Sequence, residues 1–201
     1  MRLFSSKTSP YSRKVRVALV ELGIADQVEE VIADPFNPPP ELLAANPLSK
    51  IPTLVTDRGE ALPDSGLILE YLQSRHSGIA PLPRGSRRWA ALRMQQVAEG
   101  VIDAAVATVL EKRRPESIVY APFLDRQAEA IRRSIELLEL EARGLSLEMP
   151  GVVEITTGVA LAYLDFRMPY LEWRKTAPAL AVWHAAFSER PSMQQTAPPA
   201  A

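Results

Sequence analysis

The sequence contains no cysteine and only two histidines among its 201 residues. The missing thiol excludes disulfides, thiolate metal ligands and a cysteine nucleophile, so any sulfur chemistry has to use the sulfur of a bound compound. His76 falls at a predicted helix end and His184 stands alone among apolar residues. Because two histidines so placed have no metal-ligand spacing, we expect no metal site.

The sequence also lacks a charge excess and a long apolar run. Its 23 Lys and Arg residues nearly balance 24 Asp and Glu residues, for a formal net charge of −1. Such a balance argues against nucleic acid or an anionic membrane as a partner. The longest uncharged stretch, Thr176 to Ser188, is shorter than the about 18 residues of a spanning helix. Charges near the N-terminus, from Arg2 to Arg16, interrupt any signal peptide, so we expect a soluble, cytoplasmic protein.

Apolar residues make up 47% of the chain, which is enough to furnish a buried core. The 18 prolines separate periodic segments and mark the turns between them. Within residues 1–78 the patterns predict the order βαβαββα, which indicates an α/β domain with a parallel crossover followed by a hairpin. The predicted elements are Arg2 to Ser5, a helix ending at Gly23, Val28 to Ile32, Glu41 to Ala45, Thr53 to Thr56, Glu60 to Leu62, and a helix capped by Ser65 that runs to His76.

Residues 79–86 turn to Pro, Gly and Ser and predict a linker, and residues 87–201 predict an all-helical domain. Spacings of three and four predict two amphipathic helices of a bundle, one through Met94, Val97, Val101, Ala104 and Thr108, the other through Leu124, Ala128, Ile131, Ile135, Leu138 and Ala142. Further helices are predicted from Thr156 or Thr157 to Arg167 and from Ala179 to Arg190. The tail, Pro191 to Ala201, is predicted to be a loosely packed extension.

The segment Ser9-Pro10-Tyr11-Ser12 lies where the first strand gives way to the first helix. Ser9 is the N-cap, with Pro10 in the first turn, and capping alone explains a serine there. Alternatively, the free N–H groups, the positive end of the helix dipole and the Ser9 hydroxyl stabilise the thiolate of a ligand. Thr8 and Ser12 stand close enough to Ser9 to be the hydroxyl that faces the sulfur instead.

Two further positions allow a structural and a functional interpretation. Pro52 precedes a predicted strand, and most X–Pro bonds are trans; a cis bond would turn the Ile51 backbone outward to pair with an extended peptide. Asp64 and Ser65 open the third helix as a cap. Alternatively, Ser65 and the helix N–H groups bind a carboxylate while Asp64 holds an ammonium group.

Taken in order, these segments resemble bacterial glutathione S-transferases with a serine-type active site. The resemblance rests on residues 9–15 (SPYSRKV), 46–54 (NPLSKIPTL) and 64–65 (DS), and it continues at residues 162–167 (AYLDFR), 178–183 (PALAVW) and 190–192 (RPS). It implies an α/β thioredoxin-like N-terminal domain followed by an all-α helical-bundle C-terminal domain.

The resemblance also implies that glutathione binds as co-substrate, mainly to the N-terminal domain. Ser9 would activate the glutathione thiolate, and Ile51, before a cis Pro52, would pair through its backbone with the cysteinyl part. Asp64 with Ser65 would hold the γ-glutamyl group. The serines stand at the cysteine positions of the redox C-P-Y-C motif of glutaredoxins, which argues against thiol–disulfide exchange through a protein thiol.

The remaining implied contacts concern Lys50 and the second substrate. Lys50 would lie near the glycyl end of glutathione, and a small hydrophobic electrophile would occupy a cleft between the domains, lined in part by Ala104, Thr108 and Tyr120. The family is usually homodimeric, so the expected partner is a second copy. The family's capping box at the sixth helix is expected to lack its acid, because Gly158 occupies that position.

We therefore expect a glutathione transferase whose bound thiolate attacks an electrophilic carbon. Two alternatives remain open. A glutathione-dependent isomerase or peroxidase would use the same thiolate, and a glutathione-transferase-like binding or assembly protein would keep the fold without turnover.

Overall fold

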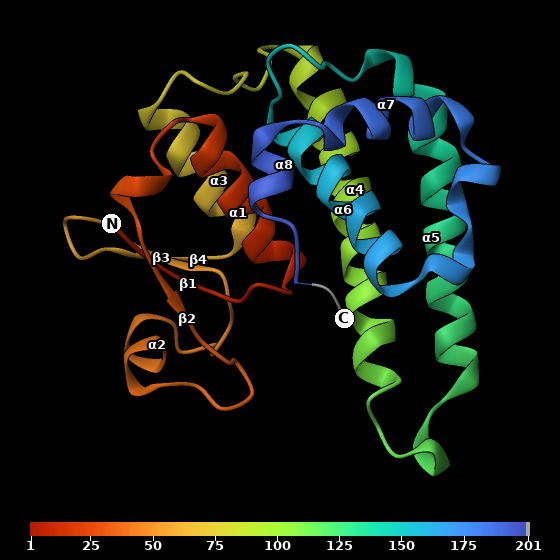
Figure 1. The fold of residues 1–201 in the computed structure, drawn as a ribbon, viewed down its shortest axis with the longest axis horizontal. Helices are drawn as coiled ribbons and strands as arrows, with labels where there is room; N and C mark the ends of the chain where they lie inside the picture. Colours follow the sequence, from red (N-terminus) through yellow and green to blue (C-terminus); the bar gives the residue numbers. More distant parts are fainter. Residues whose placement is uncertain (200–201) are drawn as a thin grey trace. The chain divides into compact units, whose positions relative to one another are not determined.

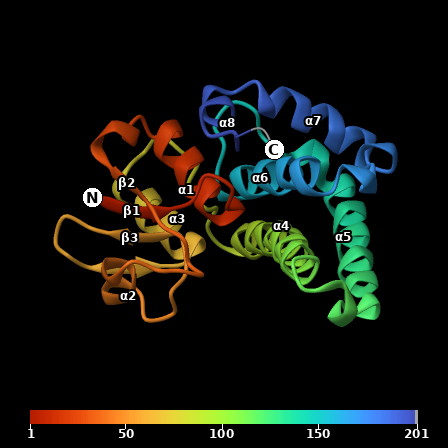
Figure 2. The same ribbon diagram turned by 60° about the horizontal axis from the view of Figure 1, so that its bottom comes forward.

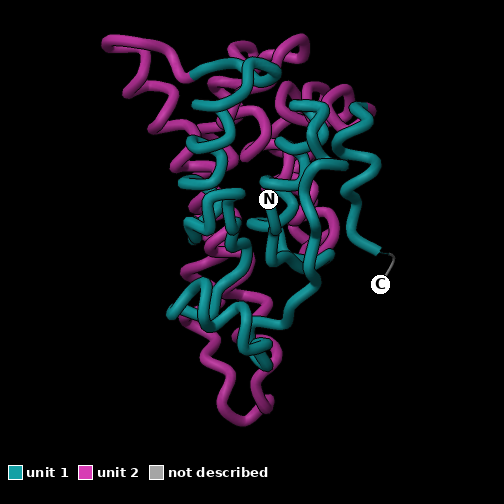
Figure 3. The backbone as a smooth tube through the Cα atoms, turned by 90° about the vertical axis from the view of Figure 1, so that its left-hand side faces the viewer, with its two compact units in different colours: residues 1–81, 190–201 teal, residues 82–189 magenta. Residues whose placement is uncertain are grey.

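The chain divides into two compact units in the computed structural model, which describes residues 1–199 (Figure 3). Unit 1 comprises Met1–Pro81 and the described residues from Arg190 onward, and unit 2 comprises Leu82–Glu189. The break after Pro81 falls inside the predicted linker. No helix of residues 1–199 is both long and apolar enough to cross a membrane.

Unit 1 is built on a four-stranded mixed sheet in the order β2-β1-β3-β4. β1 pairs in parallel with β2 and antiparallel with β3, which pairs antiparallel with β4. The predicted crossover and hairpin are therefore confirmed. The strands are β1 (Arg2–Ser5), β2 (Glu29–Ile32), β3 (Thr53–Val55) and β4 (Ala61–Pro63).

Helices cover both faces of this sheet. Within unit 1, α1 and α3 lie on one side and α2 on the other (Figure 1). Neighbouring residues of a strand point to opposite faces, and Leu3 and Phe4 of β1 are both buried. Phe4 packs against Leu42 of α2. The helices of this layer are α1 (Pro10–Glu21), α2 (Pro40–Ala45) and α3 (Ser65–Arg75).

Unit 2 is an all-helical bundle, as predicted. Its long helix α4 packs against α5 and α6, and α7 contacts both of those helices (Figure 1 and Figure 2). The helices are α4 (Ser86–Glu111), α5 (Ala121–Glu141), α6 (Val152–Arg167) and α7 (Pro178–Ser188). The predicted class, an α/β domain plus a helical bundle, is confirmed.

The predicted start of the sixth helix is wrong, because α6 begins at Val152. Thr156 lies inside the helix, and its hydroxyl donates to the Val152 carbonyl oxygen at 2.7 Å. The N-cap is Gly151, whose N–H donates to the Glu154 carboxylate at 2.9 Å. The acid of the capping box is therefore present, at Glu154, and the hydroxyl is the missing half.

The predicted loose tail is also wrong for its described part, which forms α8 (Pro191–Gln195) and joins unit 1 rather than the helical bundle. The buried guanidinium of Arg13 donates to the Met193 carbonyl oxygen at 2.9 Å. The Glu21 carboxylate accepts two hydrogen bonds of 2.7 Å from Arg190. Two residues of α1 thus hold the tail, and neither contact is visible in local sequence pattern.

Candidate functional site

The sheet register brings three of the predicted site segments to one end of the sheet of unit 1. β1 is paired antiparallel with β3, with Phe4 opposite Thr53, so the end of β1 lies beside the start of β3. Thr53 also lies opposite Pro63, so β4 ends at this same end of the sheet. The start of α1, the segment before β3 and the start of α3 therefore all lie at this end of the sheet.

Ser9 is the N-cap of α1, as predicted. Its Oγ accepts a hydrogen bond from the Ser12 N–H at 3.2 Å, and its side chain is only partly buried. A hydroxyl that accepts in this way still has its own hydrogen to donate. Pro10 occupies the first helical position and has no N–H of its own.

The two alternative hydroxyls differ in their surroundings. Ser12 is completely buried, and its Oγ accepts a hydrogen bond from the Ser6 N–H at 3.4 Å. Thr8 is partly buried like Ser9, and its Oγ1 lies 3.4 Å from the Ser6 Oγ. Ser12 is therefore enclosed in unit 1, whereas Thr8 and Ser9 reach its surface.

The Ile51–Pro52 peptide bond is cis, as the resemblance implied. Strand β3 begins at Thr53, so the N–H and C=O groups of Ile51 lie outside the sheet ladder. The Lys50 side chain is exposed next to them. This segment therefore offers main-chain groups beside a cation.

Asn46 holds this segment in place, a role that the sequence analysis missed. Its buried side chain donates from Nδ2 to the Lys50 carbonyl oxygen at 3.1 Å and to the Thr53 Oγ1 at 2.9 Å. Its Oδ1 accepts a hydrogen bond from the Leu48 N–H at 3.0 Å. Asn46 starts the motif quoted above, and an Asn before a proline is a turn signal that could have indicated this contact.

Asp64, rather than Ser65, caps α3, so that prediction is corrected. The Asp64 Oδ1 accepts hydrogen bonds from the N–H groups of Gly66 at 2.7 Å and Leu67 at 3.2 Å, with Asp64 at φ = 76°. Ser65 is the first helical residue and is 1% exposed, and its Oγ has no hydrogen-bond partner among the described residues. A buried hydroxyl without a partner is costly, and here it stands at a helix N-terminus, where carboxylates bind well.

Cations follow Ser9 along α1, where the first turn holds no acid. Burial, and to a lesser extent the neighbouring Arg16, lowers the pKa of Arg13 to about 10, so Arg13 stays protonated at neutral pH. Burial also lowers the pKa of Arg16, while Glu30 opposes that shift. These buried charges add to the positive potential at the start of the helix.

Comparison with known families agrees with this geometry. Residues 3–80 match the glutathione S-transferase N-terminal domain, and residues 121–186 match the glutathione S-transferase C-terminal domain. The chain belongs to the glutathione S-transferase family.

Three relatives show the range of this family around the chain. An uncharacterized GST-like protein of Escherichia coli, YibF, is 34% identical over the whole of both chains, and a stringent starvation protein A homolog of Pasteurella multocida is 33% identical over 69% of this chain and 70% of that one. A glutathione transferase family member from Pseudomonas fluorescens has two solved structures that resemble this fold. One, with bound glutathione, has 41% identity, a TM-score of 0.91 and 98% coverage of both chains. The other, with bound S-(propanoic acid)-glutathione, has 40% identity, a TM-score of 0.89 and coverage of 99% of this chain and 100% of that one.

The three predicted electrophile contacts of this transferase family member lie in unit 2. Ala104 and Thr108 are buried one turn apart on α4, and the Thr108 hydroxyl donates to the Ala104 carbonyl oxygen at 2.8 Å. Tyr120 is the N-cap of α5 and is 63% exposed, and its N–H donates to the Glu111 carboxylate at 2.9 Å. Unit 2 therefore brings two of the three together.

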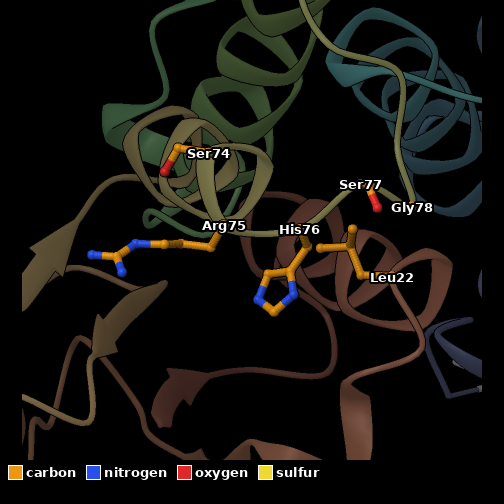
Figure 4. A pocket seen from close by; sticks show the side chains of 6 residues that line it. All are labelled: Leu22, Ser74, Arg75, His76, Ser77 and Gly78. Carbon is orange, nitrogen blue, oxygen red and sulfur yellow. The ribbon is translucent and has the colours of Figure 1, made fainter.

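An open depression of about 620 Å³ lies at the other end of α3 from the predicted glutathione residues. Its polar side chains do not converge, since Arg75 and His76 point in different directions (Figure 4). Nowhere in residues 1–199 do three His, Asp or Glu side chains gather as a metal site would require. The lining residues are Leu22, Ser74, Arg75, His76, Ser77 and Gly78.

Proposed function

We propose that this protein is a glutathione transferase in which the Ser9 hydroxyl donates a hydrogen bond to the thiolate of bound glutathione. The observation that carries this assignment is the N-cap geometry of α1. The Ser9 Oγ accepts from the Ser12 N–H and so keeps its hydrogen for a ligand, at a helix start followed by buried cations. The Pseudomonas relative that binds glutathione supports the choice of ligand.

The Ser9 hydrogen bond and the dipole of α1 together can supply the stabilisation that a glutathione thiolate needs at neutral pH. A free thiol has a pKa of about 8.5, and lowering it by two units requires about 2.7 kcal/mol of preferential stabilisation of the thiolate. One hydrogen bond to a charged group contributes about 1.5–3 kcal/mol. The dipole of α1 adds about 0.3–1 kcal/mol.

The rest of glutathione has matching groups in unit 1. Its γ-glutamyl carboxylate would accept from the Ser65 hydroxyl and the N–H groups at the start of α3, while Asp64 would hold the ammonium group. The Ile51 backbone would pair with the cysteinyl part, and Lys50 would face the glycyl carboxylate. The buried Ser65 Oγ, without a partner, would gain its missing hydrogen bond.

In the reaction, the glutathione sulfur forms a bond to an electrophilic carbon, and the leaving group departs with its electron pair. Ala104, Thr108 and Tyr120 remain our assignments for contacts with that electrophile. The Pseudomonas relative that binds a sulfur-substituted glutathione supports a thioether as the product. Reduced glutathione belongs to a reducing compartment, so the proposed location is the cytoplasm. The proposed role of the conjugation is detoxification of the electrophile.

Two measurements test this function. Calorimetric titration with glutathione should show binding, and conjugation of an activated aryl halide should fall sharply in Ser9→Ala while binding survives. Unchanged turnover in that variant would remove Ser9 from the mechanism. A peroxide or an isomerisable substrate in the same assay separates transferase from peroxidase and isomerase activity.

A second candidate is a binding or assembly protein without turnover. The similarity to a stringent starvation protein A homolog favours it, because that relative's name gives no transferase activity. Absence of heat at millimolar glutathione would select this candidate and contradict the glutathione site. We also propose that the protein is a homodimer. Light scattering coupled to size-exclusion chromatography tests this by giving the molar mass in solution.

A further inference from the structure

Arg13 is a buried cation whose hydrogen-bond partners carry no charge. It lies on α1 and is only 8% exposed. Its Nη2 donates to the Met193 carbonyl oxygen at 2.9 Å, and its Nε donates to the Thr196 Oγ1 at 3.4 Å. Within residues 1–199 it forms no ion pair. The interior of unit 1 therefore holds a positive charge that no carboxylate of the described chain cancels.

The neutral partners of Arg13 come from the C-terminal segment of unit 1. α8 contacts α1, and the two helices lie side by side (Figure 1). The Thr196 hydroxyl donates its own hydrogen to the Ser192 carbonyl oxygen at 2.7 Å, so its oxygen is free to accept from Arg13. These oxygens hold the guanidinium in place, whereas an acid in their position would also neutralise it.

Arg13 lies one helical turn after Ser9. Its backbone N–H donates to the Ser9 carbonyl oxygen at 3.0 Å. Four residues of helix rise about 6 Å, and side chains on a helix lean toward its N-terminus. The guanidinium charge therefore lies about 10 Å from the Ser9 hydroxyl, all within unit 1.

Other charges at this end of unit 1 are paired. The Arg16 Nε lies 3.3 Å from the Glu30 carboxylate, and Lys7 donates to the same carboxylate. The Asp64 carboxylate accepts from two N–H groups at the start of α3. A charge beside a partner has a weak field at a distance, and an exposed one is screened by salt, whereas a buried, uncancelled charge acts further.

We propose that Arg13 stabilises the thiolate of bound glutathione through its buried charge, and that α8 positions the guanidinium for this role. The inference rests on the proposed function and adds a second residue to the same site, one that does not touch the sulfur. A unit charge about 10 Å away at an effective dielectric constant of about 20 changes a pKa by about one unit.

Titration of the thiol in the glutathione complex of the full chain tests the proposal. Arg13→Met removes the charge and keeps a long side chain, so it should raise the pKa of the bound thiol by about one unit. Arg13→Lys keeps the charge and loses the planar donors, so it should leave the thiol pKa close to the wild-type value. If Arg13→Met fails to fold, Arg13→Gln, which keeps an N–H donor for α8, decides in its place.

Arg58→Met is the matched control. Arg58 is exposed in the turn between β3 and β4, at the opposite end of the sheet from the start of α1. This variant removes the same charge from the same unit, but from a position in water. It should therefore leave the pKa of the bound thiol unchanged.

Binding of S-methylglutathione separates an electrostatic role from a structural one, because its sulfur cannot ionise. Arg13→Met should weaken glutathione binding about tenfold at about pH 8.5, where the bound sulfur is a thiolate in wild type. At about pH 5 the bound thiol is protonated, and the Kd should be that of wild type. The Kd of S-methylglutathione should be unchanged at both values.

The outcomes separate the role of Arg13 from the proposed function. If wild type lowers the thiol pKa and Arg13→Met lowers it equally, Arg13 has no such role and the transferase proposal stands. An equal rise in Arg13→Met and Arg13→Lys, or an equal loss of affinity for both ligands, would show that Arg13 only maintains the structure. If wild type does not bind glutathione, or binds it without lowering its thiol pKa, the proposed function itself fails.

Discussion

At the scale of single residues, the sites of interest are polar groups whose hydrogen bonds are incomplete in the free protein. The Ser9 hydroxyl has a hydrogen to donate, and the Ser65 hydroxyl is buried without a partner. Sequence alone pointed to both serines, because their order and spacing follow a known family. It could not indicate whether Asp64 or Ser65 caps α3, since an Asp-Ser pair fits either register and only the backbone at Asp64 decides.

Ser65→Ala is expected to weaken glutathione binding without destabilising the free protein. The hydroxyl has no partner to lose, so removing it should leave the free energy of unfolding unchanged or raise it by about 1–2 kcal/mol. The Kd of glutathione should rise about tenfold, because a hydrogen bond to a carboxylate is lost. Urea denaturation and calorimetric titration measure the two effects.

Thr157→Val is the matched control for Ser65→Ala. The Thr157 hydroxyl is also buried without a partner, but it lies inside α6 of unit 2. This variant should match the stability effect and keep the wild-type Kd. Equal loss of affinity in both variants would contradict a specific role for Ser65.

At the scale of elements, α6 and α7 of unit 2 pack closely where Gly158 faces Phe187. A Cβ added at Gly158 of α6 would overlap the Phe187 ring of α7, so Gly158→Ala should destabilise the protein by about 1–3 kcal/mol. A Cβ added at Gly100 of α4 would meet only open space. Gly100→Ala should therefore stabilise the protein by about 0.5–1 kcal/mol. Denaturation midpoints that move in the same direction in both variants would refute this packing.

The attachment of α8 to α1 should depend on pH. Burial raises the pKa of Glu21, but hydrogen bonds from Arg190 and Ser192 outweigh it and hold the pKa below 4.5. A depressed carboxyl pKa gives stability that is present above pH 4.5 and is lost as the pH falls through the folded value.

Glu21→Gln should therefore be less stable than wild type at pH 7, by about 1.5–3 kcal/mol. The stability difference should shrink below pH 4.5 and close as the pH falls through the lowered pKa of Glu21, where the wild-type carboxyl becomes protonated as well. Urea denaturation of both proteins across this range measures it. A gap that is the same at every pH would show that the Glu21 charge does not hold α8.

At the scale of the whole molecule, the sequence predicted the order of elements in both units because each signal is local: apolar periodicity, prolines between segments, and glycines at turns. The tail was mispredicted for a physical reason. Arg190 and α8 are held by hydrogen bonds to Glu21 and Arg13, which lie more than 160 positions away, and local sequence pattern does not reveal such contacts. Buried Arg13 was missed in the same way, since a cation on a helix normally indicates a solvated face.

Titration of the bound glutathione thiol is the most direct test of the central claim, which is that Ser9 stabilises the thiolate. The ultraviolet absorbance of the thiolate, followed against pH, gives this pKa in wild type, Ser9→Ala and Thr8→Val. We predict a wild-type pKa near 6.5, about two units below a free thiol, a rise of at least one unit in Ser9→Ala, and no change in Thr8→Val. An unshifted pKa in wild type, or a rise in Thr8→Val alone, would contradict the account.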